Sequence, residues 1–364
     1  MSPMLTRSLG SPSWPHIDCV IIGVNCAQTL ARCLASVQAA DYPADRLHIY
    51  YADGGSADGS LTIAERFAGV SAIPLSPEYP TPGLGRNRGW QQGASPIVQF
   101  LDSDTVLDHG WLKSGATALN DAAVGAVLGM RNEMHPQRSL FNWIGDLEWN
   151  GPVGEADCFG GDVMIRREVL ETTGGYDEVL VGGEDPELSR RVIRAGWRIL
   201  RLPAPMTCHD LAMNRIRQYL KRAFRSGYGF AAVRAREARQ NSDFWHYEMR
   251  KIGIRGGGFV LLSIAGVLLV VSGSGVAAVI GMGCLAVGII LLLRPRLFLV
   301  NKFKQRYNLS RKQANCYAWH CSVIVLPQLL GVVRYYWGKW LNRPLRNRRR
   351  LRSTSSIDPK GMVS

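Results

Sequence analysis

The sequence lacks the patterns of several common protein classes. Its eight cysteines include no Cys-x-x-Cys pair and no Cys/His array at zinc-binding spacing, so neither a zinc module nor a disulfide scaffold is indicated. No Gly-x-Gly-x-x-Gly follows the first apolar run, which argues against a Rossmann dehydrogenase. Residues 1–16 contain three prolines and no apolar stretch, unlike a signal peptide. We therefore expect the first domain to stay in the cytoplasm.

Acidic residues are almost absent from the last third of the chain. Residues 251–364 hold 18 Lys and Arg against one acidic residue, whereas residues 1–209 hold 16 basic and 24 acidic residues. The formal net charge of +14 therefore comes from the C-terminal part. Because this basic part is also strongly apolar, we expect it to meet anionic membrane lipids, and we do not expect nucleic acid as a partner.

No charged residue interrupts the stretch 259–293. One helix of this length would measure about 52 Å, whereas the hydrocarbon core of a bilayer is about 30 Å thick. We therefore expect a break at 272–275 and a two-helix hairpin over about 256–293, within a membrane region of 251–342; one long tilted helix is the alternative. Basic residues flank both ends of the hairpin, which places both ends in the cytoplasm by the positive-inside rule.

A third apolar segment, over about 315–340, is weaker because it contains His320, Pro327 and Gln328. If this segment crossed the membrane, the basic tail over 343–364 would lie outside the cell, against the positive-inside rule. The sequence therefore favours a re-entrant or interfacial segment, with a third span as the alternative.

Short apolar runs alternate with helical patterns over residues 16–209. This alternation is typical of an α/β domain whose mixed, mainly parallel sheet is covered by helices, and such sheets bind ligands beyond the carboxyl ends of their strands. We expect residues 1–15 to be disordered and residues 210–250 to form amphipathic helices at the membrane surface. The expected strands are 17–24, 47–52, 70–75, 96–101 and 198–208.

Polar residues follow three of these strands, namely Asn25, Asp53 and the Asp102-Ser103-Asp104 segment. Two carboxylates at positions i and i+2 of a strand end can converge on one divalent cation, Mg²⁺ or Mn²⁺, which would bridge diphosphate oxygens. An isolated D-x-D is more often a turn or a helix cap. Its place after a strand of an α/β unit favours a site.

Two later features offer groups for chemistry. Glu184 and Asp185 precede a helical pattern, where they either cap the helix or supply a general base for an acceptor hydroxyl. His209 follows the last strand-like run and is either a structural histidine or a third metal ligand.

A helical stretch beyond His209 is rich in basic and aromatic residues. It suits a helix that lies on anionic headgroups or that steers a lipid-linked acceptor, and a solvated helix face is the alternative. Its cations expected at the acceptor or the membrane surface are Arg217, Lys221, Arg222 and Arg225.

The order of these motifs resembles that of family 2 inverting glycosyltransferases, which have the GT-A fold. The resemblance covers about residues 16–230, and the ordered series is more specific than any one motif. The series comprises Asn25, 53–59 (D-G-G-S-A-D-G), 85–89 (G-R-N-R-G), 102–104 (D-S-D), 159–162 (F-G-G-D), 174–178 (G-G-Y-D-E), 184–197 (E-D-P-E-L-S-R-R-V-I-R-A-G-W) and His209.

The resemblance implies a nucleotide-diphosphate sugar as donor, first of all a UDP-sugar. Asp53 would contact the nucleobase and Arg86 the base or a phosphate, and Asn25, Asp102 and Ser103 would lie at the nucleotide sugar.

The resemblance also implies a divalent metal and a base. Asp104 would be the firmer metal ligand, with Asp102 and His209 beside it. Asp185 would be the base and Glu184 its support, and in-line attack would invert the anomeric carbon.

Two departures from the family pattern narrow these expectations. Gly54 stands where the family commonly has a second acid, which leaves base recognition open. The Q-x-x-R-W motif of processive synthases is absent from 217–224, so we expect one sugar to be transferred per acceptor, without polymerisation.

The layout of catalytic domain and short apolar tail resembles bacterial enzymes, including glucosyltransferases, that assemble exopolysaccharide repeat units on a lipid-linked acceptor at the inner membrane. The alternatives are a sugar transferase onto polyprenyl monophosphate and a catalytically inactive membrane scaffold.

Overall fold

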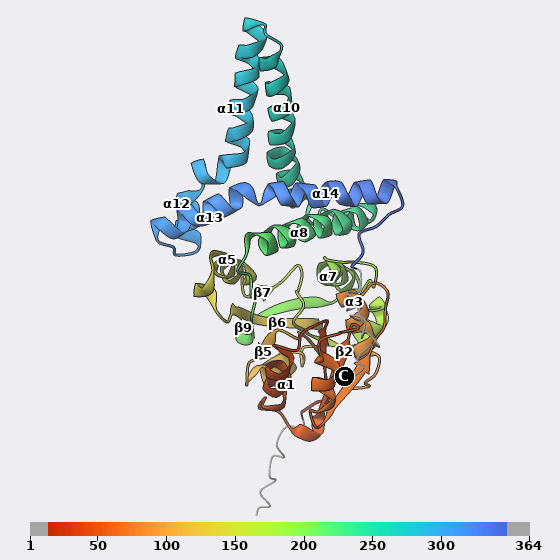
Figure 1. The fold of residues 1–364 in the computed structure, drawn as a ribbon. Coiled ribbons are helices and arrows are strands. Elements are labelled where there is room, and N and C mark those ends of the chain that lie inside the picture. Colours follow the sequence, from red (N-terminus) through yellow and green to blue (C-terminus); the bar gives the residue numbers. More distant parts are fainter. Residues whose placement is uncertain (1–13, 348–364) are drawn as a thin grey trace, which may run out of the picture.

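The structure, a computed structural model, describes residues 14–347. It consists of a nine-stranded sheet domain with helices packed against it, followed by C-terminal helices, two of which form a long projecting hairpin (Figure 1). The expected disorder before residue 14 and the basic tail beyond residue 347 lie outside the described residues.

The first half of the sheet is parallel. Strand β1 (Ile17–Gly23) pairs with β2 (Leu47–Asp53) on one side and β4 (Ile97–Asp102) on the other, and β3 (Val70–Pro74) extends the sheet beyond β2. All residues of β1 except the last are buried. Burial on both faces explains why this strand is a continuous apolar run in the sequence. The connecting helices are α1 (Leu30–Gln38), α2 (Ser60–Glu65) and α3 (Pro82–Trp90).

The second half of the sheet is mixed. Its strands are β5 (Thr105–Leu107), β6 (Val124–Glu133), β7 (Gly154–Glu155), β8 (Val163–Arg166) and β9 (Arg198–His209). The short β8 lies antiparallel between β4 and β6, and the full order is β3-β2-β1-β4-β8-β6-β9-β5 with β7 beside β9. The helices of this half are α4 (Trp111–Ala118), α5 (Leu140–Trp149), α6 (Arg167–Thr173) and α7 (Glu184–Arg194). The expected mixed α/β sheet is confirmed.

Local chemistry sets the start of two helices that carry site residues. Helix α3 begins at Pro82, because the Thr81 side chain accepts a hydrogen bond from the Leu84 N–H at 3.1 Å and proline suits the first helical position. Helix α7 follows Gly183, whose φ of 89° is accessible to glycine at little cost.

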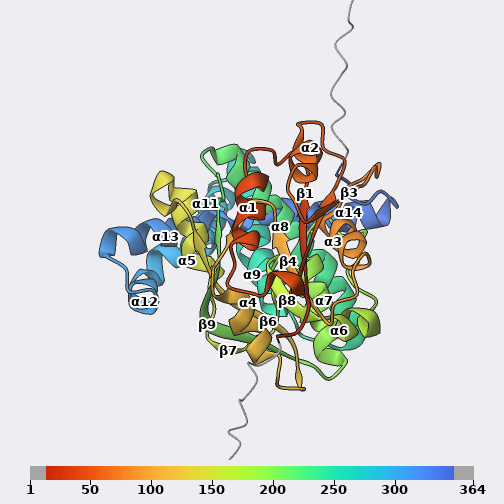
Figure 2. The same cartoon turned by 90° about the horizontal axis from the view of Figure 1, so that it is seen from below.

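The C-terminal helices form two layers above the sheet domain. Helix α8 lies directly on the domain, and α13 and α14 run across the far side of α8 (Figure 1); seen from below, the blue helices α13 and α14 emerge on both sides of the sheet domain (Figure 2). These helices are α8 (Ile216–Glu237), α9 (His246–Lys251), α10 (Gly258–Val271), α11 (Gly275–Phe298), α12 (Val300–Arg306), α13 (Arg311–Val323) and α14 (Val325–Trp340), with a π-helical turn over Ile252–Gly257.

Helices α8 and α14 approach each other closely through glycine. A Cβ added at Gly227 would overlap the Gln328 carbonyl oxygen, and one added at Gly331 would overlap the Phe224 carbonyl oxygen. Because no side chain separates the two backbones here, α8 is held tightly between the sheet domain and α14.

Helices α10 and α11 form the projecting hairpin, with the turn at 272–274 where the sequence predicted a break. Gly266 and Gly281 let the two backbones touch, as in packed membrane helices. The hairpin surface carries exposed apolar side chains, including Leu261, Val271 and Val276. Three helical stretches, His246–Val271, Gly275–Arg306 and Arg311–Trp340, are long and apolar enough to cross a membrane.

Candidate active site

The polar residues at the strand ends lie along one edge of the sheet. In the parallel register, Asp53 is opposite Gly23 and Asp102 is opposite Ile22. The loop that carries Asn25 follows directly, so the expected nucleotide-binding side chains of β1, β2 and β4 lie close together.

The loop hydrogen bonds shape this edge. The Asp53 carboxylate accepts N–H groups of Gly55 and Ser56 at 3.0 and 2.8 Å and the Tyr51 hydroxyl at 3.0 Å. Asn25, with a φ of 55°, accepts the N–H of Ala57 at 2.9 Å. Asp53 therefore stabilises the turn after β2. Ser103, which is also buried, donates its N–H to the Ile22 carbonyl at 3.0 Å.

Asp102, Asp104 and His209 could hold a metal ion, because one ligand atom from each lies within 4.8 Å of the other two. His209 Nε2 is 3.1 Å from an Asp104 oxygen, which follows from the pairing of β5 with β9. Among residues 14–347, the buried Nδ1 of His209 has no hydrogen-bond partner. Two carboxylates and an imidazole suit Mn²⁺ and similar divalent cations. The structure thus brings together the three residues that the sequence analysis expected as metal ligands.

Arg86 forms ion pairs with three carboxylates of the site, one at the end of β4 and two at the start of α7. Its guanidinium lies 2.9 Å from Asp102, 3.1 Å from Glu184 and 3.2 Å from Asp185, and its side chain is only 2% exposed. Although burial alone would raise the pKa of Asp102, the Arg86 guanidinium holds that pKa below its usual range. Arg86 therefore positions Asp102 against the two acids at the start of α7.

The Asp185 carboxyl is the strongly perturbed acid of the site. Burial raises the pKa of Asp185 to about 8, the neighbouring Glu184 and Asp102 charges act in the same direction, and Arg86 opposes them. A carboxylate whose pKa lies near the working pH is suited to act as a general base, because it can both accept and release a proton at that pH.

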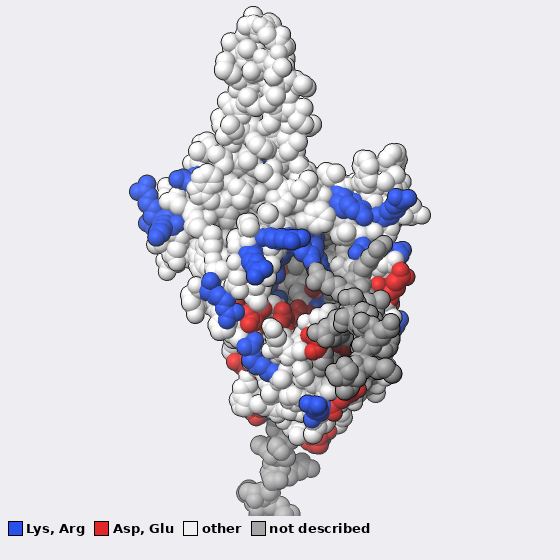
Figure 3. Space-filling model, in the orientation of Figure 1, with Lys and Arg blue, Asp and Glu red and all other residues white. Residues whose placement is uncertain are grey.

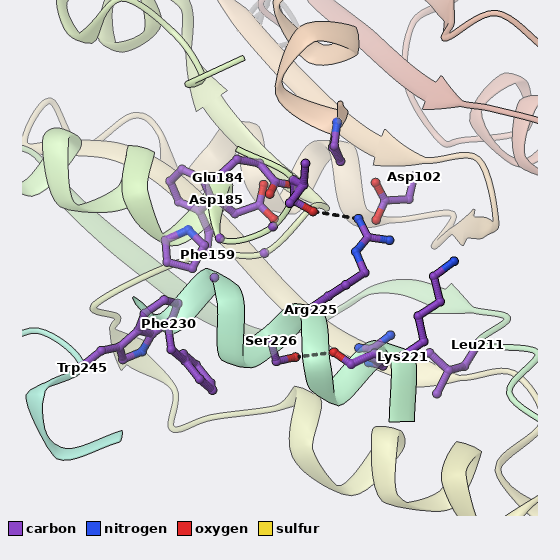
Figure 4. A pocket seen from close by; sticks show the side chains of 18 of the residues that line it. Asp102, Phe159, Glu184, Asp185, Leu211, Lys221, Arg225, Ser226, Phe230 and Trp245 are labelled. Carbon is purple, nitrogen blue, oxygen red and sulfur yellow. Dashed lines mark hydrogen bonds between the residues drawn. The ribbon is translucent and has the colours of Figure 1, made fainter. Parts of the chain in front are cut away.

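A cavity of about 690 Å³ opens beside these acids. Its walls include Asp102, Glu184 and Asp185, and its rim comes from α8. Acidic side chains gather in a hollow with basic side chains along its upper edge (Figure 3). The α8 side chains that line it include Lys221, Arg225 and Ser226 (Figure 4). Arg222 on the same helix also lines it.

Not every expected site residue borders this cavity. Arg217 on α8 is exposed and does not line it. Asn25 and Asp53 lie outside it, at the sheet edge, as do Asp104 and His209. The candidate site therefore has two parts: the cavity lined by Asp102, Glu184 and Asp185, and the adjoining sheet edge that carries the other expected residues.

Sequence reasoning missed Arg131, and it assigned no role to Asp162, which it noted only as part of the 159–162 segment. Arg131, at the end of β6, lies 3.0 Å from Asp162 and 3.6 Å from Asp102. Asp162 in turn accepts the Asp102 N–H at 3.1 Å and the Thr207 hydroxyl at 2.8 Å. The apolar run before Arg131 was the available signal, since a polar residue after such a run marks the same sheet edge.

Comparisons with known proteins decide the family. Residues 18–174 match the family described as "Glycosyl transferase family 2", and residues 147–215 match "N-terminal domain of galactosyltransferase". The chain carries a family 2 glycosyltransferase domain. This domain contains the strand-end residues, Arg86 and Asp162, whereas the acids at α7 fall within the second match.

The curated relatives of this chain are distant. It is 24% identical over 223 residues to glycosyltransferase AglE of Haloferax volcanii, covering 59% of this chain and 73% of that protein. It is 27% identical over 245 residues to an N-acetylglucosaminyltransferase of Mesorhizobium japonicum, covering 59% of this chain and 56% of that one. The succinoglycan biosynthesis protein ExoA of Rhizobium meliloti is 28% identical over 165 residues, which are 42% of this chain and 50% of ExoA.

A solved structure shares the fold. The mannosyltransferase PcManGT from Pyrobaculum calidifontis, in complex with GDP-Man and Mn²⁺, superposes with a TM-score of 0.61 at 18% identity. The match covers 90% of this chain and 89% of that one, so it extends beyond the sheet domain. The expected GT-A architecture is confirmed.

Proposed function

We propose that this family 2 protein is a membrane-anchored, inverting glycosyltransferase. It moves one sugar from a nucleotide-diphosphate sugar, first of all a UDP-sugar, to a lipid-linked acceptor at the cytoplasmic face of a bacterial inner membrane. The observation that carries the proposal is the position of Asp185 and its raised pKa. This acid lies in a cavity between the strand-end carboxylates and the cations of α8, and its pKa is about 8.

The proposed chemistry is a single displacement. Asp185 accepts the proton of the acceptor hydroxyl while the hydroxyl oxygen bonds to the anomeric carbon from the face opposite the leaving group. The bond from that carbon to the diphosphate breaks, and its electron pair leaves with the nucleotide diphosphate. The anomeric configuration is therefore inverted.

The residues around Asp185 would position the base, hold the metal and bind the nucleotide. Arg86 holds Asp102, Glu184 and Asp185 in fixed relation, so the base is preorganised next to the donor end of the site. Asp102, Asp104 and His209 would hold the divalent metal. That ion supplies positive charge for the diphosphate leaving group. Asn25, Asp53 and Ser103 would form the nucleotide end of the site.

The membrane proposal rests on the hairpin. Its charge-free legs are close in length to the hydrocarbon core, and its outward side chains are apolar. Helices α13 and α14 cross the foot of the hairpin (Figure 1), so they would lie along the membrane surface when the hairpin is inserted. This arrangement supports the interfacial reading of the third apolar segment over a third span.

The test is sugar transfer in membranes that contain the wild type or Asp185→Asn. Radiolabelled UDP-glucose, UDP-galactose, UDP-N-acetylglucosamine and GDP-mannose are offered in turn with Mg²⁺ or Mn²⁺ and extracted lipid. We expect organic-soluble label that requires metal and disappears in the variant. Label that forms equally with Asp185→Asn would remove Asp185 as the base, and label on polyprenyl monophosphate would identify the alternative transferase.

A further inference from the structure

A second cavity, of about 840 Å³, lies at the foot of the hairpin. Helix α9, the π-helical turn and helices α11, α12 and α13 contribute its walls. We call it the basic cavity because its lining includes Arg250, Lys251, Arg255, Arg294, Lys302 and Arg306.

Most of this positive charge has no acidic partner. The two acids of the lining are already engaged, Glu248 with Lys251 and Glu148 with His320. Arg255 is buried and donates to backbone carbonyls, including that of Cys321 at 2.7 Å. Within residues 14–347, no carboxylate lies at ion-pair distance from the remaining four cations, Arg250, Arg294, Lys302 and Arg306. Cations gathered around a cavity attract an anion.

The rest of the lining is aromatic and apolar. Tyr247, Phe303 and Tyr307 contribute aromatic surface, and Ile254 and Leu299 contribute aliphatic surface. Aromatic side chains of this kind are enriched where protein meets the lipid headgroups. The apolar hairpin begins directly beyond this cavity, so a ligand with an anionic end and a hydrocarbon chain matches both surfaces.

The basic cavity adjoins the cavity of about 690 Å³ that is lined by Asp102, Glu184 and Asp185, which we call the catalytic cavity. Both are lined by Phe230 and Trp245, whose rings meet edge to face at 4.7 Å between centroids. Trp245 has a φ of 58°, a backbone conformation that is costly for an aromatic residue. A bulky ring is thus held in a strained conformation at the boundary of the two cavities.

A third cavity, of about 280 Å³, adjoins both of them. It shares Arg222 and Ser226 with the catalytic cavity, and Glu148 and His320 with the basic cavity. The three cavities are therefore neighbours, in a row from the hairpin foot to the acids.

We propose that the basic cavity binds the phosphate-bearing end of a membrane lipid, with the hydrocarbon chain along the hairpin. Under the proposed function, on which this identification of the lipid rests, the lipid is the acceptor. Its phosphate is held by the cations of the basic cavity, and the sugar attached to the phosphate reaches Asp185 past Phe230 and Trp245.

The test uses the purified full chain in detergent micelles, with farnesyl diphosphate and inorganic pyrophosphate as probes. The variant Arg294→Gln/Lys302→Gln removes two exposed cations of the lining. The matched control, Lys304→Gln/Arg311→Gln, removes the same charge from exposed positions that line none of the described cavities.

We expect farnesyl diphosphate to bind the lining variant on the order of tenfold more weakly than the wild type, because charge-assisted contacts to phosphate are lost. The control should bind like the wild type. Equal affinities for all three proteins would overturn the inference. Pyrophosphate that binds as tightly as farnesyl diphosphate would overturn the lipid part, since the chain would then add nothing.

Transfer assays separate this inference from the proposed function. If the wild type transfers sugar and the lining variant shows an unchanged KM for extracted lipid, the basic cavity is not the acceptor site, although the transferase proposal stands. If the lining variant loses lipid binding but the wild type transfers from no donor, the lipid site stands and the transferase proposal fails.

Discussion

Replacement of Arg86 should destabilise the sheet domain more than any exposed charge change on the same helix. Arg86 is buried among Asp102, Glu184 and Asp185, so Arg86→Met leaves three carboxylates without their shared cation. Removing one partner of a buried ion pair typically costs about 3–5 kcal/mol. For a domain of this size, that corresponds to a fall of about 6–20 °C in Tm.

Arg88 provides the matched control, two residues along α3. Its side chain is 43% exposed and pairs with a Glu178 that is 36% exposed, at 3.2 Å. An exposed pair of this kind contributes about 0–1 kcal/mol, so Arg88→Met should lower Tm by less than about 4 °C.

The loss at Arg86 should also depend on pH. Burial raises the pKa of Asp185 and Arg86 opposes that rise, so removing Arg86 raises the folded-state pKa further. A carboxyl whose folded pKa exceeds its unfolded value loses stability as pH rises between the two values. We therefore expect the smallest loss near pH 5 and the largest near pH 9.

Circular dichroism of the full chain in detergent, heated at pH 5, 7 and 9, measures these differences. Equal falls in Tm for the two variants at pH 9 would refute the reasoning, and so would a large fall for Arg86→Met that does not change with pH.

Three further predictions address the base, the metal and the helix contact. The kcat/KM of the wild type should rise with pH up to about 8, where the Asp185 carboxyl is half ionised, and Asp185→Asn should lose about 10²–10⁴-fold; a flat profile in a transfer assay would contradict this role. His209→Ala should raise the Mn²⁺ concentration for half-maximal transfer by on the order of tenfold, and an unchanged metal titration would exclude His209 as a ligand. Gly331→Val should lower the thermal stability of the full chain because its Cβ would overlap the Phe224 carbonyl. Gly283→Val, where nothing lies within 4 Å, should leave stability unchanged, and equal Tm values for the two would refute the packing argument.

The strand-end residues could be predicted because their signal is local. Buried parallel strands are continuous apolar runs, and the polar residues after β1, β2 and β4 therefore mark one sheet edge. The same reasoning placed Asn25, Asp53 and Asp102 together without any knowledge of the side-chain contacts.

The middle of the sheet could not be predicted in this way. Strand β8 has only four residues and pairs antiparallel with strands far away in the sequence, so no periodic pattern indicates it. Its insertion beside β4 is what brings Asp162 to Asp102. The Arg131 contacts depend on the same insertion and were missed with it.

The partners of Arg86 were also beyond sequence reasoning. A sequence shows that an arginine is present, but the choice between phosphate and carboxylate depends on residues about 100 positions away. Likewise, the basic residues of α8 fit both a membrane surface and the catalytic cavity until α14 covers the opposite face of the helix.

The glycine contact between α8 and α14 has a consequence for acceptor choice. Because the two backbones touch, Glu184 and Asp185 lie at a fixed distance from the layer formed by α13 and α14. Under the proposed function, only an acceptor whose hydroxyl reaches that distance would react. An acceptor with one sugar too few would fall short of Asp185, and one with a sugar too many would pass it. The packing of α8 against α14 would thus select acceptors by the length of their glycan, without specific contacts to the other hydroxyl groups of that glycan.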